Sequence, residues 1–197
     1  QARFTASARA LLTLRNKSLN EIKTILVKKP YSVLRDIVLE IHKSDEKQVV
    51  VTSSHAKLTG NDVARALASY MQSDKIKIAI IDFSLKTKKQ NINDEQLSFG
   101  SFVVTESSGQ ISALRSHSNL PTIDFLINKD FWQTIQALNS TFDLVFLCAD
   151  NADAISLLTA AEGQKTFHIT LARTKKTKST SLIQMRSLLP IQGLIYD

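Results

Sequence analysis

The residues that could do chemistry lie in one stretch, TSSHAKLTGND, at positions 52–62. The three valines Val49–Val51 precede it and predict a strand buried on both faces. After it, apolar residues recur at helical spacing from Val63 to Met71. A loop between a buried strand and a helix can bind phosphate, because the free N–H groups at the helix start point at the anion. The chemistry to look for is therefore phosphate binding or phosphoryl transfer.

The side chains that this chemistry needs are missing from the loop. A P-loop uses glycines to wrap its backbone around the phosphates, a lysine for the β- and γ-phosphates, and a serine or threonine for Mg²⁺. In an ungapped match, Gly60 stands at the lysine position and Asn61 at the position of the Mg²⁺ ligand. Lys57 and Thr59 stand where glycines belong. Asp62 adds a carboxylate to the first helical turn, and this charge repels a phosphate there.

A second buried strand must help to position the loop. Ile76–Ile81 is rich in isoleucine and ends at Asp82. Strand, helix and strand then form a βαβ unit with parallel strands, and ligands of such units bind beyond the C-terminal ends of the strands. The loop and Asp82 are therefore expected at the same edge of the sheet. An ordinary strand–loop–helix, never related to nucleotide binding, is the alternative explanation of this layout.

The segments VVVTSS, VARALA and IAIIDFSLK resemble the cytoplasmic ATPase domain of bacterial tyrosine kinases and polysaccharide co-polymerases. This family belongs to the deviant P-loop ATPases, which include the MinD and ParA proteins. Its loop reads like TSxxPGEGKST and its second strand like LLIDADLR. Thr52 and Ser53 match the start of that loop. Asp82 matches the first aspartate of the strand motif, while Ser84 replaces the second.

A third motif of the family, YDYVIIDTPP, resembles FDLVFLCADNADA at residues 142–154. Cys148 takes the place of the metal-side aspartate, and Asp150 and Asn151 replace the prolines. The segment at residues 120–143 resembles the one that leads into this strand in the family. The resemblance extends from about Tyr31 to Tyr196, and each of its catalytic motifs is altered.

The resemblance implies an α/β fold, a three-layer, P-loop NTPase-like, mostly parallel sheet with helices on both faces, over residues 31–197. Residues 1–30 are predicted to form an N-terminal helical arm or linker, with an amphipathic or frayed helix over Gln1–Leu14. We expect no catalytic residue, no metal ligand and no ATP or Mg²⁺ cofactor, because the phosphoryl-transfer groups are absent. The degenerate phosphate-loop and metal-side positions are Ser53, Thr59, Gly60, Asn61, Asp82 and Cys148.

By the same resemblance, the function is that of a catalytically inactive scaffold or regulator in exopolysaccharide biosynthesis, chain-length control or export. Such a domain would be the soluble part of a membrane protein, on the cytoplasmic side of the bacterial inner membrane. Its partners would be membrane-embedded polysaccharide assembly proteins or further copies of itself. Two alternatives stay open. One is an unconventional nucleotide-binding domain that uses Ser53, the loop backbone and Asp82; the other is a MinD/ParA-like positioning adaptor for a partner protein or DNA.

The chain is basic, with 25 Lys and Arg against 18 Asp and Glu and a formal net charge of +7. Such a balance suits nucleic acid, an acidic membrane surface, or nothing more than solubility. No aromatic residues are interleaved with the lysines in a base-stacking pattern, so a solvated or membrane-facing basic surface is favoured over nucleic acid. No apolar run approaches the ~20 residues of a membrane span.

The remaining candidate groups predict structure more than chemistry. The single cysteine, Cys148, excludes an intrachain disulfide and fits a reducing compartment. The four histidines lack metal-ligand spacing. His55 beside Ser53 could suggest a nucleophile–base pair, but no acid partner or oxyanion motif accompanies it. His168 lies in a predicted strand and is interpreted as a core or edge residue.

Further elements follow from caps and periodicity. Ser18 and Glu21 predict a capping box for a helix to Val27, Ser32 a cap for a helix over residues 33–42, and Asp130 a cap for a helix that carries Trp132. Other predicted elements are a loop at 86–96, strands 144–147, 166–171 and 191–196, and helices 154–161 and 180–189. Two short strands are predicted at 102–105 and 110–114, and they could form a hairpin or the last piece of the sheet.

Overall fold

The structure is a computed structural model of the chain and describes residues 2–29, 31–54, 58–72, 75–83, 98–99, 102–116, 126, 129–173 and 177–196. Over these residues it contains one nine-stranded sheet in the order β1-β9-β8-β2-β7-β3-β6-β5-β4. The strands from β1 to β6 in this order run parallel, and β5 and β4 continue the sheet in antiparallel pairing. The strands are β1 (Phe4–Ser7), β2 (Gln48–Ser54), β3 (Ile78–Asp82), β4 (Ser98–Phe99), β5 (Phe102–Ser108), β6 (Ile111–Ser116), β7 (Leu144–Asp150), β8 (Phe167–Ala172) and β9 (Gly193–Tyr196).

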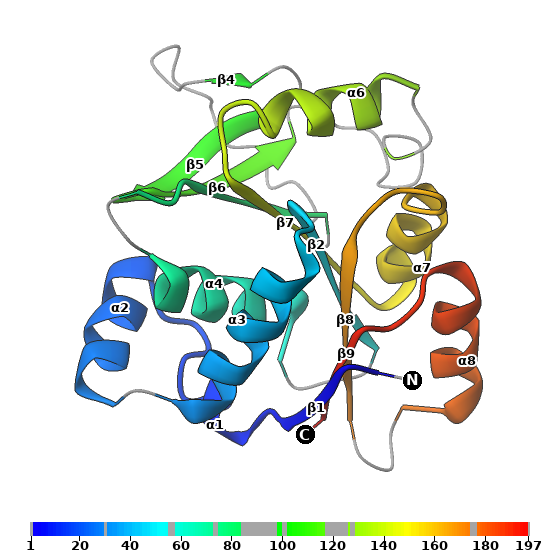
Figure 1. The fold of residues 1–197 in the computed structure, drawn as a ribbon, viewed down its shortest axis with the longest axis horizontal. Helices are drawn as coiled ribbons and strands as arrows, with labels where there is room; N and C mark the ends of the chain where they lie inside the picture. Colours follow the sequence, from blue (N-terminus) through cyan, green and yellow to red (C-terminus); the bar gives the residue numbers. More distant parts are fainter. Residues whose placement is uncertain are drawn as a thin grey trace.

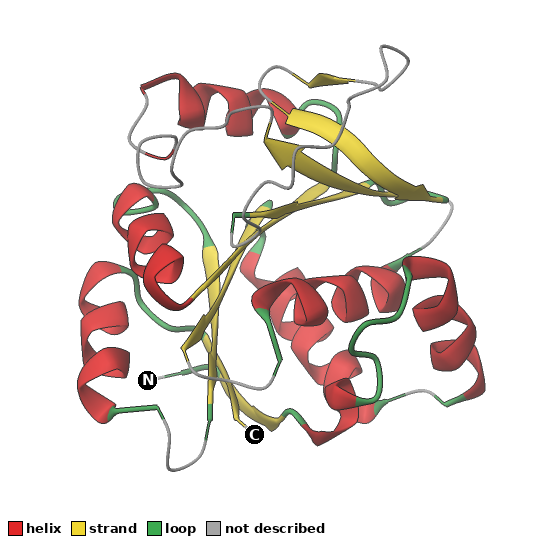
Figure 2. Ribbon diagram, turned by 180° about the vertical axis from the view of Figure 1, so that it is seen from behind, coloured by secondary structure: helices red, strands yellow, loops and turns green. Residues whose placement is uncertain are grey.

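Helices cover both faces of the sheet, as Figures 1 and 2 show. One face packs against α1 (Arg9–Leu12), α2 (Leu19–Lys28), α3 (Ser32–Ser44) and α4 (Gly60–Met71). The other face packs against α6 (Lys129–Leu138), α7 (Asn151–Ala160) and α8 (Ser179–Leu188). The predicted α/β architecture, a mostly parallel sheet between two helical layers, is confirmed.

The central strands are buried on both faces, as their valine-rich sequences predict. In β2, Val49 and Val51 belong to the core under α1–α4, whereas Val50 belongs to the core under α6–α8. In β7, Phe146 belongs to the core under α1–α4 and Val145 to the core under α6–α8. Alternate side chains of a strand point to opposite faces, so each strand supplies both cores.

The structure confirms one of the three predicted helix caps and places the other two residues inside their helices. The capping box of Ser18 and Glu21 is confirmed at the start of α2. Ser32 does not cap α3 but is its first residue, and the cap position falls on Tyr31, which makes no side-chain cap hydrogen bond. Asp130 likewise lies inside α6, which begins at Lys129. Propensity locates such helices, but the backbone path decides which residue is the cap.

The predicted helix over Gln1–Leu14 is wrong for the first part of this segment. Residues 4–7 form an edge strand, not part of a helix, and pair in parallel with β9. Phe4 stacks on Phe167 with ring centroids 6.4 Å apart, and Leu11 and Leu14 are buried in the core under α1–α4. The domain boundary at residue 30 stays a prediction. The expected loop at residues 86–96 lies outside the described residues.

Candidate functional site

The sheet brings the predicted site residues to one edge, at the C-terminal ends of β2, β3 and β7. Ser53 of β2 stands opposite Asp150 of β7, and Asp82 of β3 stands opposite Cys148. The start of α4 follows β2 and lies over the same edge, since Gly60 is close to both Val51 and Cys148. The strand–loop–helix layout and the expected convergence are therefore present.

The first turn of α4 is capped by its own residues. Thr59 is the cap residue, and its hydroxyl accepts a hydrogen bond from the Asp62 backbone N–H at 3.0 Å. In return, the Thr59 backbone N–H donates to Asp62 Oδ2 at 2.9 Å. This reciprocal capping box satisfies two of the donors that a helix start leaves free. In a phosphate-binding loop, such donors would face the ligand.

A third donor of this turn is used by Asp150, a residue far away in sequence. The Gly60 backbone N–H donates to Asp150 Oδ1 at 2.9 Å. Asp150 is also the cap residue of α7, but its side chain makes no cap hydrogen bond there. The carboxylate thus lies at the positive end of α4, where a helix dipole favours an anion. The protein supplies this anion itself.

Gly60 has no room for a side chain. A Cβ atom built on this residue would lie 2.6 Å from the Val51 carbonyl oxygen and 3.5 Å from Cys148 Cβ. The first distance is shorter than any ordinary contact, and the atom in the way is backbone of a central strand. The close approach of α4 to β2 therefore requires glycine at this position. A lysine at position 60 is incompatible with this backbone.

Beneath Gly60, the Cys148 thiol is completely buried in β7. Burial raises its pKa well above the ordinary value, and the negative charges of Asp82, Asp150 and Asp62 raise it further. A thiol with a raised pKa remains protonated and unreactive at neutral pH. The positive charge of Arg65 acts in the opposite direction and lowers the pKa of this thiol.

The hydroxyl of Ser53, near the end of β2, forms a hydrogen bond to the backbone of Leu58. Ser53 is buried, and its Oγ donates to the Leu58 carbonyl oxygen at 3.2 Å. That proton is therefore committed to the backbone, which gives no support to a nucleophile at Ser53. His55, Lys57 and Ser84, singled out in the sequence, lie outside the described residues.

At the first turn of α4, Asn61 is held by Arg65. Arg65 Nε donates to Asn61 Oδ1 at 3.3 Å, and its Nη2 forms a 2.8 Å ion pair with Glu106 Oε2. Glu106 also accepts a hydrogen bond from the Leu19 backbone N–H at the start of α2. This chain of contacts connects α4, β5 and α2. Sequence reasoning missed it, since Glu106 is distant from both helices in the chain.

A buried polar network, which the sequence did not predict, connects β2 and β8 through Thr52, His168 and Thr170. Nε2 of His168 lies 2.9 Å from Thr52 Oγ1 and 2.8 Å from Thr170 Oγ1, and its Nδ1 lies 3.3 Å from the Leu189 carbonyl oxygen. His168 is fully buried, which confirms a core position in β8, between β2 and β9. Burial lowers its pKa to about 4, against the opposing effect of the carbonyl contacts. The imidazole is therefore neutral at pH 7.

Within the described part of the chain, no group of three His, Cys, Asp or Glu side chains is arranged to hold a metal ion. The same residues contain no helix with the length and apolar character needed to cross a bilayer.

No protein-family model matches this sequence, and no curated protein matches it. Solved structures do match. The kinase domain of the Escherichia coli tyrosine kinase ETK aligns with 100% of this chain and 89% of its own, at TM-score 0.66 and 14% identity. The chimerical protein CapA2B2 aligns with 100% of this chain and 93% of its own, at TM-score 0.65 and 14% identity.

The BceF tyrosine kinase domain aligns with 94% of this chain and 80% of its own, at TM-score 0.62 and 14% identity. The three alignments cover 94–100% of this chain and 80–93% of the other chains, so the similarity extends well beyond one βαβ unit. The chain therefore has the fold of bacterial tyrosine kinase domains.

Proposed function

We propose that the chain is a catalytically inactive kinase-like domain that acts as a scaffold or regulator. The observation that carries the proposal is the hydrogen bond from the Gly60 N–H to the Asp150 carboxylate. An internal anion occupies the helix start at which this fold would bind phosphate. A nucleotide phosphate would have to displace that carboxylate before it could use the same donor.

The charges and the lack of space at the start of α4 also disfavour nucleotide binding. The carboxylates of Asp62 and Asp150 each accept a backbone N–H of the first turn of α4. A triphosphate that approached them would meet like charge without the lysine that offsets it in a P-loop. The lysine itself has no room at position 60. Loss of one preorganised donor costs on the order of a hundredfold in rate, and here several contributions are lost together.

The biological setting follows from the family resemblance. We propose a role in exopolysaccharide biosynthesis, chain-length control or export, on the cytoplasmic side of the bacterial inner membrane. The partners would be membrane-embedded polysaccharide assembly proteins or further copies of the domain. In this role the domain would provide binding surfaces for its partners and would not catalyse a reaction. The shared fold supports the proposal, because the chain has the framework of a kinase domain. Its sequence has Gly60 and Asn61 where a P-loop has the lysine and the Mg²⁺ ligand.

Calorimetric titration with ATP and Mg²⁺ tests this proposal. We expect no binding heat and no phosphate release above the rate in buffer. ATP without Mg²⁺ and ADP with Mg²⁺ serve as parallel titrations. Micromolar binding of any of them would contradict the proposal and favour the unconventional nucleotide-binding domain. Hydrolysis that disappears in Asp82→Asn would show that catalysis survives.

A further inference from the structure

The positive charge of the chain is concentrated at its beginning. Residues 1–35 contain eight Lys and Arg and a single acidic residue, Glu21, which gives a formal charge of +7. Residues 36–197 contain the other 17 basic residues and 17 acidic residues, which cancel. The whole net charge of the domain therefore comes from β1, α1, α2 and the start of α3.

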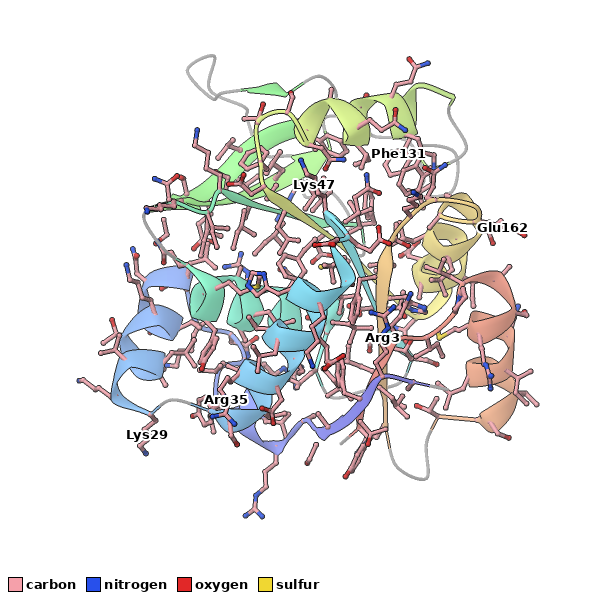
Figure 3. The ribbon with its side chains drawn as sticks, viewed as in Figure 1. Arg3, Lys29, Arg35, Lys47, Phe131 and Glu162 are labelled. Carbon is pink, nitrogen blue, oxygen red and sulfur yellow. The ribbon has the colours of Figure 1, made fainter. Side chains whose placement is uncertain are left out.

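Seven of these eight basic residues are exposed around the α1–α2–α3 junction, which we name the basic corner. It consists of Arg9, Arg15, Lys17, Lys23, Lys28, Lys29 and Arg35. The Thr13 and Tyr31 hydroxyls are 2.9 Å apart, which connects the end of α1 to the start of α3. Arg9 lines a pocket of about 420 Å³ together with Tyr31, Ser32 and Val33. Figure 3 shows Lys29 and Arg35 at this corner.

The protein neutralises little of this charge. Lys17 pairs with Glu21 at 3.6 Å, and Arg35 pairs with Asp36 at 3.3 Å. Among the described residues, the other five members form no salt bridge. The start of α3 adds to the positive potential, because it has no acidic residue in its first turn and no side-chain cap. The basic corner therefore attracts an anionic partner.

An apolar side chain projects from the same corner. Val27 is 78% exposed, although it lies next to Lys28 on α2. The buried side of α2 is formed by Leu19, Ile22 and Leu26. Lys23 and Val27 are four positions apart in α2, so they lie one above the other on the outward face. Lysines around an exposed valine match the boundary of a bilayer, where the ammonium groups meet headgroup phosphates and the valine meets acyl chains.

We propose that the basic corner docks on an anionic phospholipid bilayer. Nucleic acid is less well matched. Tyr31, the aromatic residue at this corner, is half-buried and its hydroxyl pairs with Thr13, so it offers no stacking platform. The exposed valine would gain nothing from a phosphodiester backbone. The inference rests on the proposed function for its choice of a membrane as partner, and it gives that membrane a defined contact surface.

Vesicle flotation of the 197-residue chain tests the proposal. The probes are vesicles of phosphatidylcholine and vesicles with about 30% phosphatidylserine, at about 0.1 M salt. We expect binding to the anionic vesicles alone, and its loss at about 0.5 M salt. Each lysine removed should weaken binding about fivefold, so the triple variant Lys23→Ala, Lys28→Ala, Lys29→Ala should lose about a hundredfold.

A matched triple variant separates location from net charge. Lys77, Lys165 and Lys178 are exposed outside the basic corner, and their replacement by alanine also lowers the formal charge from +7 to +4. Equal loss in both triples would overturn the proposal, as would equal binding to neutral and anionic vesicles. Failure to bind anionic vesicles, with binding to a short DNA duplex that the first triple abolishes, would assign the corner to nucleic acid. None of these outcomes affects the ATP titration, so the two proposals fail separately.

Discussion

Lowering the pH from 7 to 5 should destabilise the fold through one buried imidazole. His168 is fully buried, and both of its ring nitrogens are in hydrogen-bonding contact with the protein. The pKa of His168 is lowered from 6.5 to about 4, chiefly because burial disfavours the charged ring. Between these two values the unfolded chain binds a proton that the folded protein does not. Stability is therefore complete above about pH 6.5 and is lost as the pH falls toward 4.

The size of the effect follows from the two pKa values. The full shift corresponds to about 3 kcal/mol in the free energy of unfolding, since one pKa unit is about 1.4 kcal/mol. Between pH 7 and pH 5, about 2 kcal/mol of this should be lost. The pKa of the capping carboxylate Glu21 is lowered from 4.5, so its contribution disappears only below about that pH. The window from pH 7 to 5 thus isolates the histidine.

Urea unfolding at several pH values, followed by Trp132 fluorescence, measures this loss. In His168→Gln the free energy of unfolding should be lower at pH 7 but almost constant down to pH 5. The control is His42→Gln, which changes an exposed histidine of α3 and should keep the full pH dependence. A loss below about 0.5 kcal/mol in the parent chain, or an unchanged loss in His168→Gln, would refute the reasoning.

Three further outcomes are expected at the start of α4. Gly60→Ala should lower the free energy of unfolding by about 1–3 kcal/mol, because its Cβ meets the Val51 backbone. The control is Ser32→Ala at the exposed first residue of α3, and urea midpoints compare the two variants. Asp150→Asn should cost about 1–3 kcal/mol by weakening the charged hydrogen bond to Gly60, while ATP hydrolysis, measured as phosphate release, stays undetectable. A double-mutant cycle of Arg65→Met and Glu106→Gln should give a coupling free energy of about 1 kcal/mol, and a value near zero would mean that solvent screens this pair.

Much of the fold could be predicted because the relevant signals are local. Three consecutive valines in β2 indicate a strand buried on both faces, and the Ser18–Glu21 pair indicates a capped helix. The absence of a lysine at Gly60 can be read directly from the sequence. The short segment at residues 4–7 was misassigned, since its strand exists only through pairing with β9. An edge strand of four residues has little periodicity of its own.

The sequence by itself determined the framework: which segments form the buried central strands, which helix faces are apolar, and which phosphate-binding side chains are missing. Only the tertiary structure decided where the polar groups go. Asp150 could have capped its own helix, α7, but the sheet places it beside Gly60, 90 residues away in the chain. His168 meets Thr52 for the same reason. Secondary structure is encoded by neighbours along the chain, whereas the partner of a buried polar group depends on which strands lie side by side.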